Sequence, residues 1–308
     1  MIKAAFSLPD WCKVREILGG LMLVPDRMAK LWQSVEAGQM SPEDCVSEQE
    51  VLLEPYRAEW TKAQLCNGET DLRAGLLKEV AAYYHVSDSA DIDRACDSAV
   101  DTLKSEWDKS VDSQQRSSVE SFYETKTHIY DLMNWHTLRD DSGPLAYVVA
   151  LQIARAHSVR SCLDFGSGVG SGGLLFRFAD IDTTLADIST TLLDFARWRF
   201  DRRRLPARFV NLKDTPLPES SFDMILAMDV FEHLVDPVEV VQQLWRAMKP
   251  GGLLFARIHA AVDPSHPQHI VEDFGPTFAR MEELGLTERW RDRALWGHLL
   301  FQKCGSPN

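Results

Sequence analysis

The sequence lacks closely spaced cysteines and long apolar runs. Its six cysteines stand at positions 12, 45, 66, 96, 162 and 304, with no C-x-x-C pair. This spacing argues against a zinc knuckle or a disulfide framework and fits a reducing compartment. No basic region followed by an apolar core opens the chain, so no signal peptide is expected. The longest apolar run, near residues 145–154, is too short to span a bilayer. We therefore expect a cytoplasmic protein that neither spans nor binds a membrane.

A surplus of positive charge is also missing. The 33 Lys and Arg residues face 46 Asp and Glu, and the formal net charge is −13. Such a balance disfavours a nucleic acid or an anionic membrane as the main partner. The composition, 45% apolar and 26% charged, is that of an ordinary globular protein, and 308 residues allow one large or two modest domains.

The first half of the chain has many helix patterns and few strand patterns. Apolar residues recur at helical spacing from Trp11 to Leu21 and from Leu72 to Tyr84. Ser41 followed by Pro42 and two acids is typical of a helix start. Residues 87–118 predict a solvated helix pair or a partly mobile segment. We predict a helical domain over residues 1–140, which caps a substrate pocket, binds a protein partner or forms a homodimer interface.

The second half begins with a glycine-rich turn after a short apolar run. Leu163-Asp-Phe-Gly-Ser-Gly-Val-Gly-Ser-Gly-Gly173 joins this predicted strand to an apolar helix. In this arrangement, backbone N–H groups at the helix start face a bound ligand. The third glycine of the dinucleotide fingerprint is replaced by Ser171, and Asp164 would repel a pyrophosphate. An ammonium or sulfonium group would tolerate that carboxylate, whereas an NAD-linked oxidoreductase is disfavoured.

Alternating strands and helices follow the turn. Thr183–Ala186 predicts a second strand, and a carboxylate at its end, Asp187, can accept hydrogen bonds from ribose hydroxyls. Ala207–Val210 predicts a third strand, and Met224–Met228 a fourth that is apolar throughout, as a sheet covered on both faces requires. The helix from Thr190 carries five arginines at positions 197, 199, 202, 203 and 204. We interpret them as the solvated face of an amphipathic helix rather than a nucleic-acid site.

Four motifs, in order across residues 159–301, resemble the class I S-adenosylmethionine-dependent methyltransferases. They are Asp-x-Gly-x-Gly-x-Gly from Asp164, the acid Asp187, the run from Asp229 to Pro237 that contains Glu-His-Leu, and the Lys-Pro-Gly-Gly turn from Lys249. The resemblance implies a seven-stranded Rossmann-like α/β sheet whose last strand pair is antiparallel, in a domain over residues 141–308. It implies S-adenosyl-L-methionine as cofactor and methyl transfer as the activity.

The resemblance also implies the residues of the site. The cofactor-binding set is Asp164, Gly166, Gly168, Gly170, Asp187, Lys213, Asp214, Met228 and Asp229. Segments before the first motif often cover the cofactor in the family, so the aromatic residues Tyr123, Tyr130 and Trp135 are expected in the acceptor pocket. Removal of a proton from the acceptor requires a base, for which His233, His259 and His136 are candidates, with His266 and His269 nearby.

The sequence analysis predicts methyl transfer to the oxygen, nitrogen or carbon of a small organic acceptor, in secondary or specialised metabolism. One alternative is a non-catalytic binding or scaffold protein that retains the methyltransferase fold. Another alternative is a metal-assisted O-methyltransferase. Asp229, Glu232 and His233 with a later histidine resemble the Glu-x-x-Glu-His…His metal site of quinone-biosynthesis and small-RNA methyltransferases, although Asp229 replaces the first glutamate.

Overall fold

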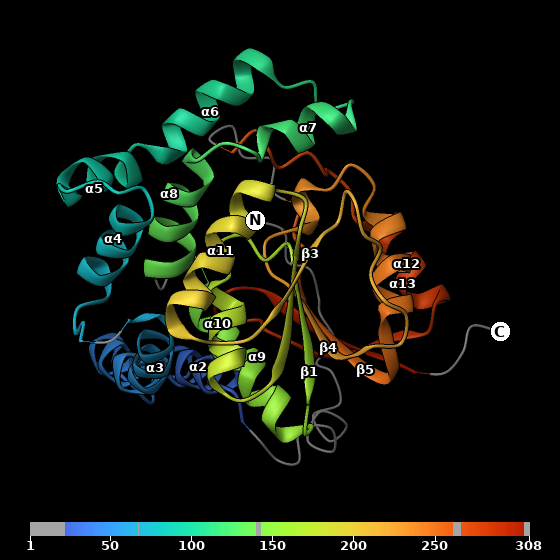
Figure 1. Cartoon of the computed structure of the whole chain (residues 1–308). Helices are drawn as coiled ribbons and strands as arrows, with labels where there is room; N and C mark the ends of the chain where they lie inside the picture. Colours follow the sequence, from blue (N-terminus) through green and yellow to red (C-terminus); the bar gives the residue numbers. More distant parts are fainter. Residues whose placement is uncertain (1–21, 67, 140–142, 261–265, 305–308) are drawn as a thin grey trace.

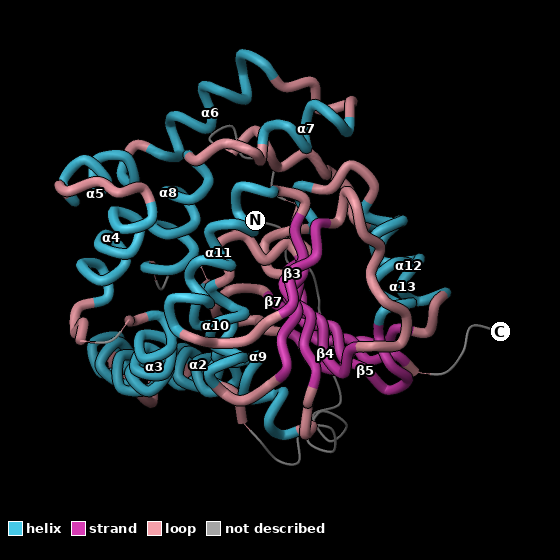
Figure 2. The backbone as a smooth tube through the Cα atoms, viewed as in Figure 1, coloured by secondary structure: helices cyan, strands magenta, loops and turns pink. Residues whose placement is uncertain are grey.

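The computed structural model describes residues 22–66, 68–139, 143–260 and 266–304. The helical pattern from Trp11 to Leu21 therefore lies outside the described residues. A single seven-stranded sheet occupies the centre of the described part, with helices on both of its faces (Figures 1 and 2). Its strand order is β3-β2-β1-β4-β5-β7-β6.

The sheet confirms the predicted fold class. The strands are β1 (Ser161–Phe165), β2 (Asp182–Asp187), β3 (Arg208–Asn211), β4 (Phe222–Ala227), β5 (Met248–Arg257), β6 (Leu286–Arg291) and β7 (His298–Lys303). The first five are parallel, while β7 is antiparallel to both β5 and β6. The four residues of β4 from Met224 to Ala227 are fully buried, as expected for a parallel strand covered on both faces.

Helices cover the sheet in two layers. One layer holds α9 (Pro144–Ala156), α10 (Ser171–Phe178) and α11 (Thr190–Arg203), and the other holds α12 (Pro237–Ala247) and α13 (Gly275–Glu283). Side-chain caps fix several helix starts: Ser189 Oγ accepts from the Leu192 N–H at 3.1 Å, and Asp236 Oδ1 accepts from the Glu239 N–H at 2.9 Å. The parallel strands end at the same edge of the sheet, and a helix follows β1, β2, β4 and β5 in the chain.

The amino-terminal helices are α2 (Val24–Glu36), α3 (Pro42–Gln64), α4 (Leu72–Tyr83), α5 (Ser89–Asp97), α6 (Ala99–Ser110), α7 (Arg116–Phe122), α8 (Thr127–Met133) and the π-helical turn η1 (Asn134–Leu138). The predicted start of α3 is confirmed, because Ser41 Oγ accepts from the Asp44 N–H at 3.0 Å. Residues 87–118 contain α5 and α6, in agreement with a helix pair. In Figure 1, α6 and α7 lie above the upper end of the sheet.

The two halves of the chain share buried surface. Tyr56 and Trp60 of α3 belong to the same hydrophobic cluster as α9, β1 and Trp290. Two hydrogen bonds add to this contact: Tyr56 Oη donates to Gln152 Oε1 at 2.6 Å, and Gln64 Nε2 donates to the Ser171 carbonyl at 2.9 Å. The domain boundary predicted at residues 140 and 141 falls on residues outside the description and stays a prediction.

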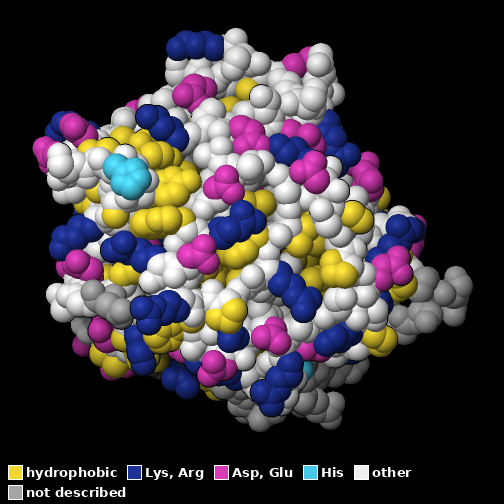
Figure 3. Space-filling view, viewed as in Figure 1, with side chains coloured by type: hydrophobic (Ala, Val, Ile, Leu, Met, Phe, Trp, Pro, Cys, Tyr) yellow, Lys and Arg dark blue, Asp and Glu magenta, His cyan; other side chains and the backbone are white. Residues whose placement is uncertain are grey.

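The surface of the described part carries both signs of charge. On the face seen in Figure 3, basic and acidic side chains are interspersed among polar and apolar ones. Within the described ranges, no helix is both long and apolar enough to cross a membrane.

Candidate active site

A cavity of about 710 Å³ opens at the carboxyl ends of β1, β2, β4 and β5. Ligands bind at this edge in sheets of this type, and the volume is that of a typical small-molecule site. The sheet supplies the residues that follow each strand, from Phe165 to Val169, Asp187 and Met228 to Val230 among them. The helical half supplies the rest of the wall, with Leu103 of α6, Asp131 and Leu132 of α8 and Trp135 to Thr137 of η1.

The glycine turn after β1 lies against β2. The N–H groups of Gly166 and Ser167 donate to the Ala186 carbonyl at 2.8 and 3.1 Å, and the Gly168 N–H donates to Asp187 Oδ2 at 2.8 Å. Gly166 has φ +66°, and a Cβ there would lie 2.4 Å from Val230 Cγ2, so the turn requires glycine. These three amides of the turn therefore bond within the protein, whereas Ser171 and Gly172 at the start of α10 line the cavity. Gly166 and Gly168 line the cavity, whereas Gly170 packs against Leu185.

Asp187, the last residue of β2, lies on the cavity wall, at the strand end where the sequence predicted it. Its Oδ1 accepts from the Ser189 N–H at 2.9 Å, and burial raises the pKa of its carboxyl despite its backbone hydrogen bonds. A carboxylate has about four acceptor positions, so further hydrogen bonds from hydroxyl groups can be accepted. Nearby, Ser167 Oγ is buried and has no hydrogen-bond partner among the described residues. This part of the wall therefore fits a polar ligand such as a nucleoside.

Asp164 lies beneath the glycine turn and outside the described cavity lining. Its Oδ2 accepts from the Gly173 N–H at 2.8 Å in the first turn of α10, and its side chain is almost fully buried. Burial, together with the charge of Asp187, raises the pKa of this carboxyl to about 7. The geometry assigns Asp164 to the support of the turn.

Lys213 and Asp214 are exposed and lie outside the described lining, while the neighbouring Leu212 lines the cavity. Lys213 Nζ instead pairs with Glu124 Oε1 at 2.5 Å. Glu124, in the turn between α7 and α8, also accepts from the Thr190 and Thr191 N–H groups at 3.2 and 3.1 Å. The sequence analysis missed this carboxylate, which ties the helical half to the start of α11. Its position near a helix N-terminus is favourable for a negative charge.

Met228 and Asp229 follow β4 and line the cavity, as the sequence predicted. Asp229 Oδ1 accepts from Arg257 Nη1 at 2.7 Å, and Asp229 Oδ2 lies 3.6 Å from His136 Nδ1. Burial alone would raise the pKa of Asp229, but His136 and Arg257 outweigh it and lower the pKa well below its ordinary value. Conversely, Asp229 raises the pKa of His136 against the effect of burial. Asp229, His136 and Arg257 form one charged group from three distant segments.

The predicted histidines all line the cavity, in different surroundings. His136 lies on η1 and its side chain is 39% exposed, whereas His259 is exposed just beyond β5. His233 follows Glu232 in the short 3-10 turn η3 (Phe231–His233), and its Nδ1 lies 3.1 Å from the Gln268 carbonyl. Burial, with a smaller effect of His269, lowers the pKa of His233 to about 3. Burial and the charge of Asp229 raise the pKa of Glu232.

Two of the three predicted aromatic residues reach the cavity. Tyr123 and Trp135 line it, and Tyr123 stacks on His128 with ring centroids 4.8 Å apart. Tyr130 does not belong to the described lining, because its side of α8 packs against α4 and α5. Tyr147 of α9 lines the cavity and was missed by the sequence analysis. We therefore leave Tyr130 out of the proposed pocket.

Arg199 corrects the prediction that the arginines of α11 form a solvated face. Its side chain is fully buried, while Arg197, Arg202 and Arg204 are exposed. The Arg199 guanidinium donates to Glu79 of α4 at 3.1 Å, to the Val169 carbonyl and Ser171 Oγ at 2.8 Å, and to Gln64 of α3 at 3.0 Å. Arg199 therefore joins the glycine turn to two helices of the amino-terminal half.

The helical spacing could have revealed this buried arginine. Arg199 follows Leu192, Phe195 and Ala196 at intervals of seven, four and three residues, which is the buried stripe of the helix. Because five arginines stand close together in this segment, they were interpreted as one exposed face, although their side chains point to different sides of the helix.

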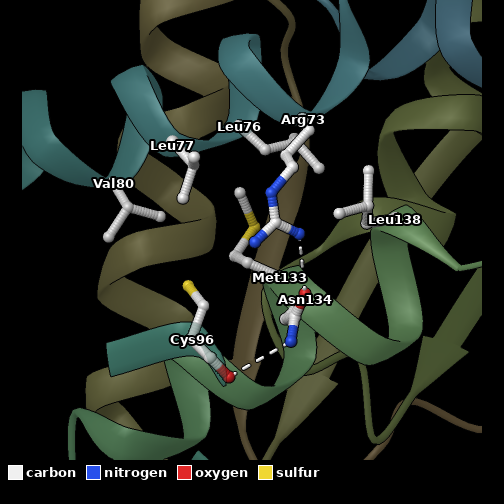
Figure 4. A pocket seen from close by; sticks show the side chains of 8 residues that line it. All are labelled: Arg73, Leu76, Leu77, Val80, Cys96, Met133, Asn134 and Leu138. Carbon is white, nitrogen blue, oxygen red and sulfur yellow. Dashed lines mark hydrogen bonds between the residues drawn. The ribbon is translucent and has the colours of Figure 1, made fainter. Parts of the chain in front are cut away.

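A second, small pocket lies between α4, α5 and η1 (Figure 4). Asn134 accepts from Arg73 Nη1 at 3.4 Å and donates to the Cys96 carbonyl at 3.1 Å, so it links the three elements. The volume of about 10 Å³ suffices for about one water molecule and excludes a nucleoside.

Comparisons with known proteins match parts of this chain. A family model described as a methyltransferase domain matches residues 163–254. A probable S-adenosylmethionine-dependent methyltransferase of Mycolicibacterium smegmatis is 31% identical over 106 residues, which cover 34% of this chain and 40% of that protein. This chain thus matches less than half of the length of that relative.

Two solved structures show partial overlap. The match to the PH0226 protein of Pyrococcus horikoshii covers 54% of this chain and 91% of that one, at 14% identity and a TM-score of 0.43. The match to the YcgJ protein of Bacillus subtilis covers 46% and 68%, at 20% identity and a TM-score of 0.41. The family model and the relative are both described as methyltransferases, in agreement with the resemblance found in the sequence.

Proposed function

We propose that this chain, whose residues 163–254 match the model of a methyltransferase domain, transfers a methyl group from S-adenosylmethionine to a small organic acceptor. The observation that carries the proposal is the continuity of one cavity. It extends from the glycine turn and Asp187 to the histidines and aromatic rings beneath the helical half. A cofactor and a small acceptor can thus occupy adjoining parts of the same cavity.

The residues that would hold the cofactor are those of the wall around the glycine turn. Gly166, Gly168, Asp187, Met228 and Asp229 line that part, and the unpartnered Ser167 Oγ offers a further polar contact. When bound, S-adenosylmethionine supplies an electrophilic methyl group on a positively charged sulfur. Asp187 carries the nucleoside contact in this proposal, because its carboxylate faces the cavity from the end of β2, beside the amide of Gly168.

The acceptor part of the cavity is lined by aromatic rings and imidazoles. Tyr123, Trp135 and Tyr147 suit a flat or apolar acceptor, and their rings exclude water. Orienting the acceptor toward the methyl group is the main contribution expected from such a pocket. For an acceptor that must lose a proton, we assign the base to His136. Its Nδ1 faces the Asp229 carboxylate, which leaves Nε2 as the position that can take up a proton.

Replacing Asp187 by alanine is expected to weaken binding of S-adenosylhomocysteine about 10- to 100-fold, since hydrogen bonds to a charged group contribute about 1.5–3 kcal/mol. Isothermal titration calorimetry measures the effect directly. Asp214→Ala is the matched control, because Asp214 is exposed and lies outside the described lining. The affinity of this variant for S-adenosylhomocysteine should stay within about twofold of that of the wild type.

Because Asp187 also accepts from backbone amides, the melting temperature of each variant is compared before the titration. Equal affinities of the Asp187→Ala variant and the wild-type protein would remove Asp187 from the proposed cofactor site. Tight binding without turnover on any acceptor would favour the alternative, a binding protein with a methyltransferase fold.

A further inference from the structure

Two buried hydroxyl groups meet between η1 and the glycine turn. Thr137 Oγ1 and Ser171 Oγ lie 2.8 Å apart, and the two residues are 0% and 6% exposed. Thr137 directly follows His136 on η1, and Ser171 is the first residue of α10. Both residues line the cavity. The contact therefore joins the segment that carries the proposed base to the segment that carries part of the proposed cofactor site.

The other partners of the two hydroxyls fix the direction of the hydrogen bond between them. Thr137 Oγ1 also bonds to the Leu132 carbonyl at 3.0 Å, and a carbonyl oxygen only accepts, so the single hydroxyl proton of Thr137 is used there. Ser171 Oγ accepts from Arg199 Nη1 at 2.8 Å, because a guanidinium group only donates. The Ser171 hydroxyl must therefore donate to Thr137 Oγ1. The result is one directed chain of hydrogen bonds that begins at Arg199 and ends at the Leu132 carbonyl.

This chain of hydrogen bonds gives a reason for the serine in the glycine-rich turn. Ser171 stands where the dinucleotide fingerprint has its third glycine. Glycine at this position would leave Arg199 Nη1 with the Val169 carbonyl alone and would leave Thr137 Oγ1 without its donor. Buried polar groups without a partner are costly. The hydroxyl at residue 171 therefore has a role in this protein that glycine cannot fill.

Contacts on both sides hold η1 in its π-helical form. Trp60 Nε1 donates to the Thr137 carbonyl at 2.7 Å, and Asn134 Nδ2 donates to the Cys96 carbonyl at 3.1 Å. The hydroxyl of Thr137 bonds to the residue five positions earlier, which is the spacing of a π turn. Such turns are rare and occur often at functional sites. His136 shares a peptide bond with Thr137, so these contacts also fix the position of His136 at the cavity.

We propose that Thr137 and Ser171 are positioning residues for His136. The hydrogen bond between the two hydroxyls holds η1 against the start of α10 and thereby keeps His136 Nδ1 close to Asp229 Oδ2, at 3.6 Å. A misplacement of about 1 Å can lower a rate about 100-fold. The effect on the rate rests on the proposed function, in which His136 is the base, whereas the effect on the position of His136 does not.

The pKa of His136, measured by NMR titration of its ring protons in the protein without an acceptor, tests this position. The charged and titratable side chains that interact with His136 are Asp229 after β4, Asp131 of α8, and Glu232 and His233 of η3. Burial would lower the pKa of His136, but Asp229 outweighs it and raises the pKa. Thr137→Val removes the hydroxyl with little change in size. His136 then moves away from Asp229, and its pKa should fall below that of the wild type.

Thr183→Val is the matched control for the loss of a buried hydroxyl. Thr183 is 4% exposed, donates to the Ile181 carbonyl at 2.9 Å and lies outside the described cavity lining. This variant should leave the pKa of His136 unchanged, as should Thr137→Ser, which keeps the hydroxyl. Ser171→Ala removes the same bond from its other side and should lower the pKa of His136. Melting temperatures show which variants are folded, and Ser171→Ala carries the test if Thr137→Val does not fold.

An equal pKa of His136 in the wild type and in the folded variants that lack the bond would overturn the proposal, and so would the same fall in Thr183→Val. With an acceptor, kcat should fall about 10- to 100-fold in Thr137→Val and stay within about threefold of the wild type in Thr137→Ser. Because the NMR titration needs no acceptor, a wild-type protein that methylates none counts against the proposed function and not against the position of His136.

Discussion

Replacing His136 by alanine is expected to lower kcat about 10²- to 10⁴-fold, the usual contribution of a positioned general base. His136 Nδ1 lies 3.6 Å from Asp229 Oδ2, and the side chain opens to the cavity. The variant removes proton uptake but none of the residues assigned to the nucleoside, so the affinity for S-adenosylhomocysteine should remain close to that of the wild type. Release of S-adenosylhomocysteine, with an acceptor found in a panel of phenols, amines and carboxylic acids, measures the rate.

Two further histidine variants give this measurement its controls. His85→Ala removes an exposed histidine outside the described cavity lining and should retain full activity. His259→Ala tests the other open position at the end of β5. Activity lost in His259→Ala but kept in His136→Ala would contradict the assignment of the base.

The pH profile gives a test that a purely structural role of His136 would not pass. A base acts when neutral, so the rate should rise with pH as His136 loses its proton. Asp229, with smaller contributions from Asp131 and Glu232, raises the pKa of His136 against burial, which places the midpoint of this rise above 6.5. His233 is also close enough to interact with His136, but burial keeps it neutral near pH 7.

Asp229→Asn should therefore shift the acidic limb of the profile to lower pH, because the charge that favours protonated His136 is removed. Arg257 loses its partner in the same variant, so folding is checked by the melting temperature. If the acidic limb lies at the same pH in Asp229→Asn and in the wild-type protein, the group that titrates in the profile is not His136.

Replacing Glu79 by alanine is expected to destabilise the fold by about 3–5 kcal/mol, the usual effect of removing one partner of a buried ion pair. Glu79 is 3% exposed and contacts both Arg199 and Arg203, whose guanidinium groups are almost fully buried. Alanine leaves these cations without their carboxylate. Equilibrium unfolding in urea, followed by circular dichroism, measures the change in midpoint and slope.

The control is an ion pair on the surface. Glu50 pairs with Arg57 at 2.7 Å, and its side chain is 62% exposed, so Glu50→Ala should change stability by no more than about 1 kcal/mol. Equal unfolding midpoints of the Glu79→Ala and Glu50→Ala variants would show that the buried cluster does not hold the two halves together.

The same cluster predicts a dependence of stability on acid. Burial would raise the pKa of Glu79, but Arg199 and Arg203 outweigh it and keep the pKa below its ordinary value of 4.5. The stabilising contribution is then present above pH 4.5 and decreases as the pH falls through the lower, folded-state pKa. Wild-type protein should lose this contribution in acid, whereas the stability of Glu79→Ala should depend less on pH in that range.

The sequence by itself determined the sheet and one end of the site. The strands and the glycine turn follow from the local alternation of apolar runs, glycines and helix starts, and the position of Asp187 follows from the end of its strand. Local patterns of this kind depend on residues close together in the chain, so they can be predicted without knowledge of tertiary packing. The recognised motifs added the order of the strands and the antiparallel edge.

Tertiary structure alone decided which distant side chains meet. His136 reaches Asp229 because η1 lies beside the end of β4, and His269 reaches Glu232 because a later segment bonds to its carbonyl. The same cause turned Arg199 from a predicted surface residue into a buried contact of Glu79. Spacing can place Arg199 on the buried side of its helix, but it does not identify the partners of these contacts. The partners are decided by the packing of elements far apart in sequence and by the free energy of burying their faces together.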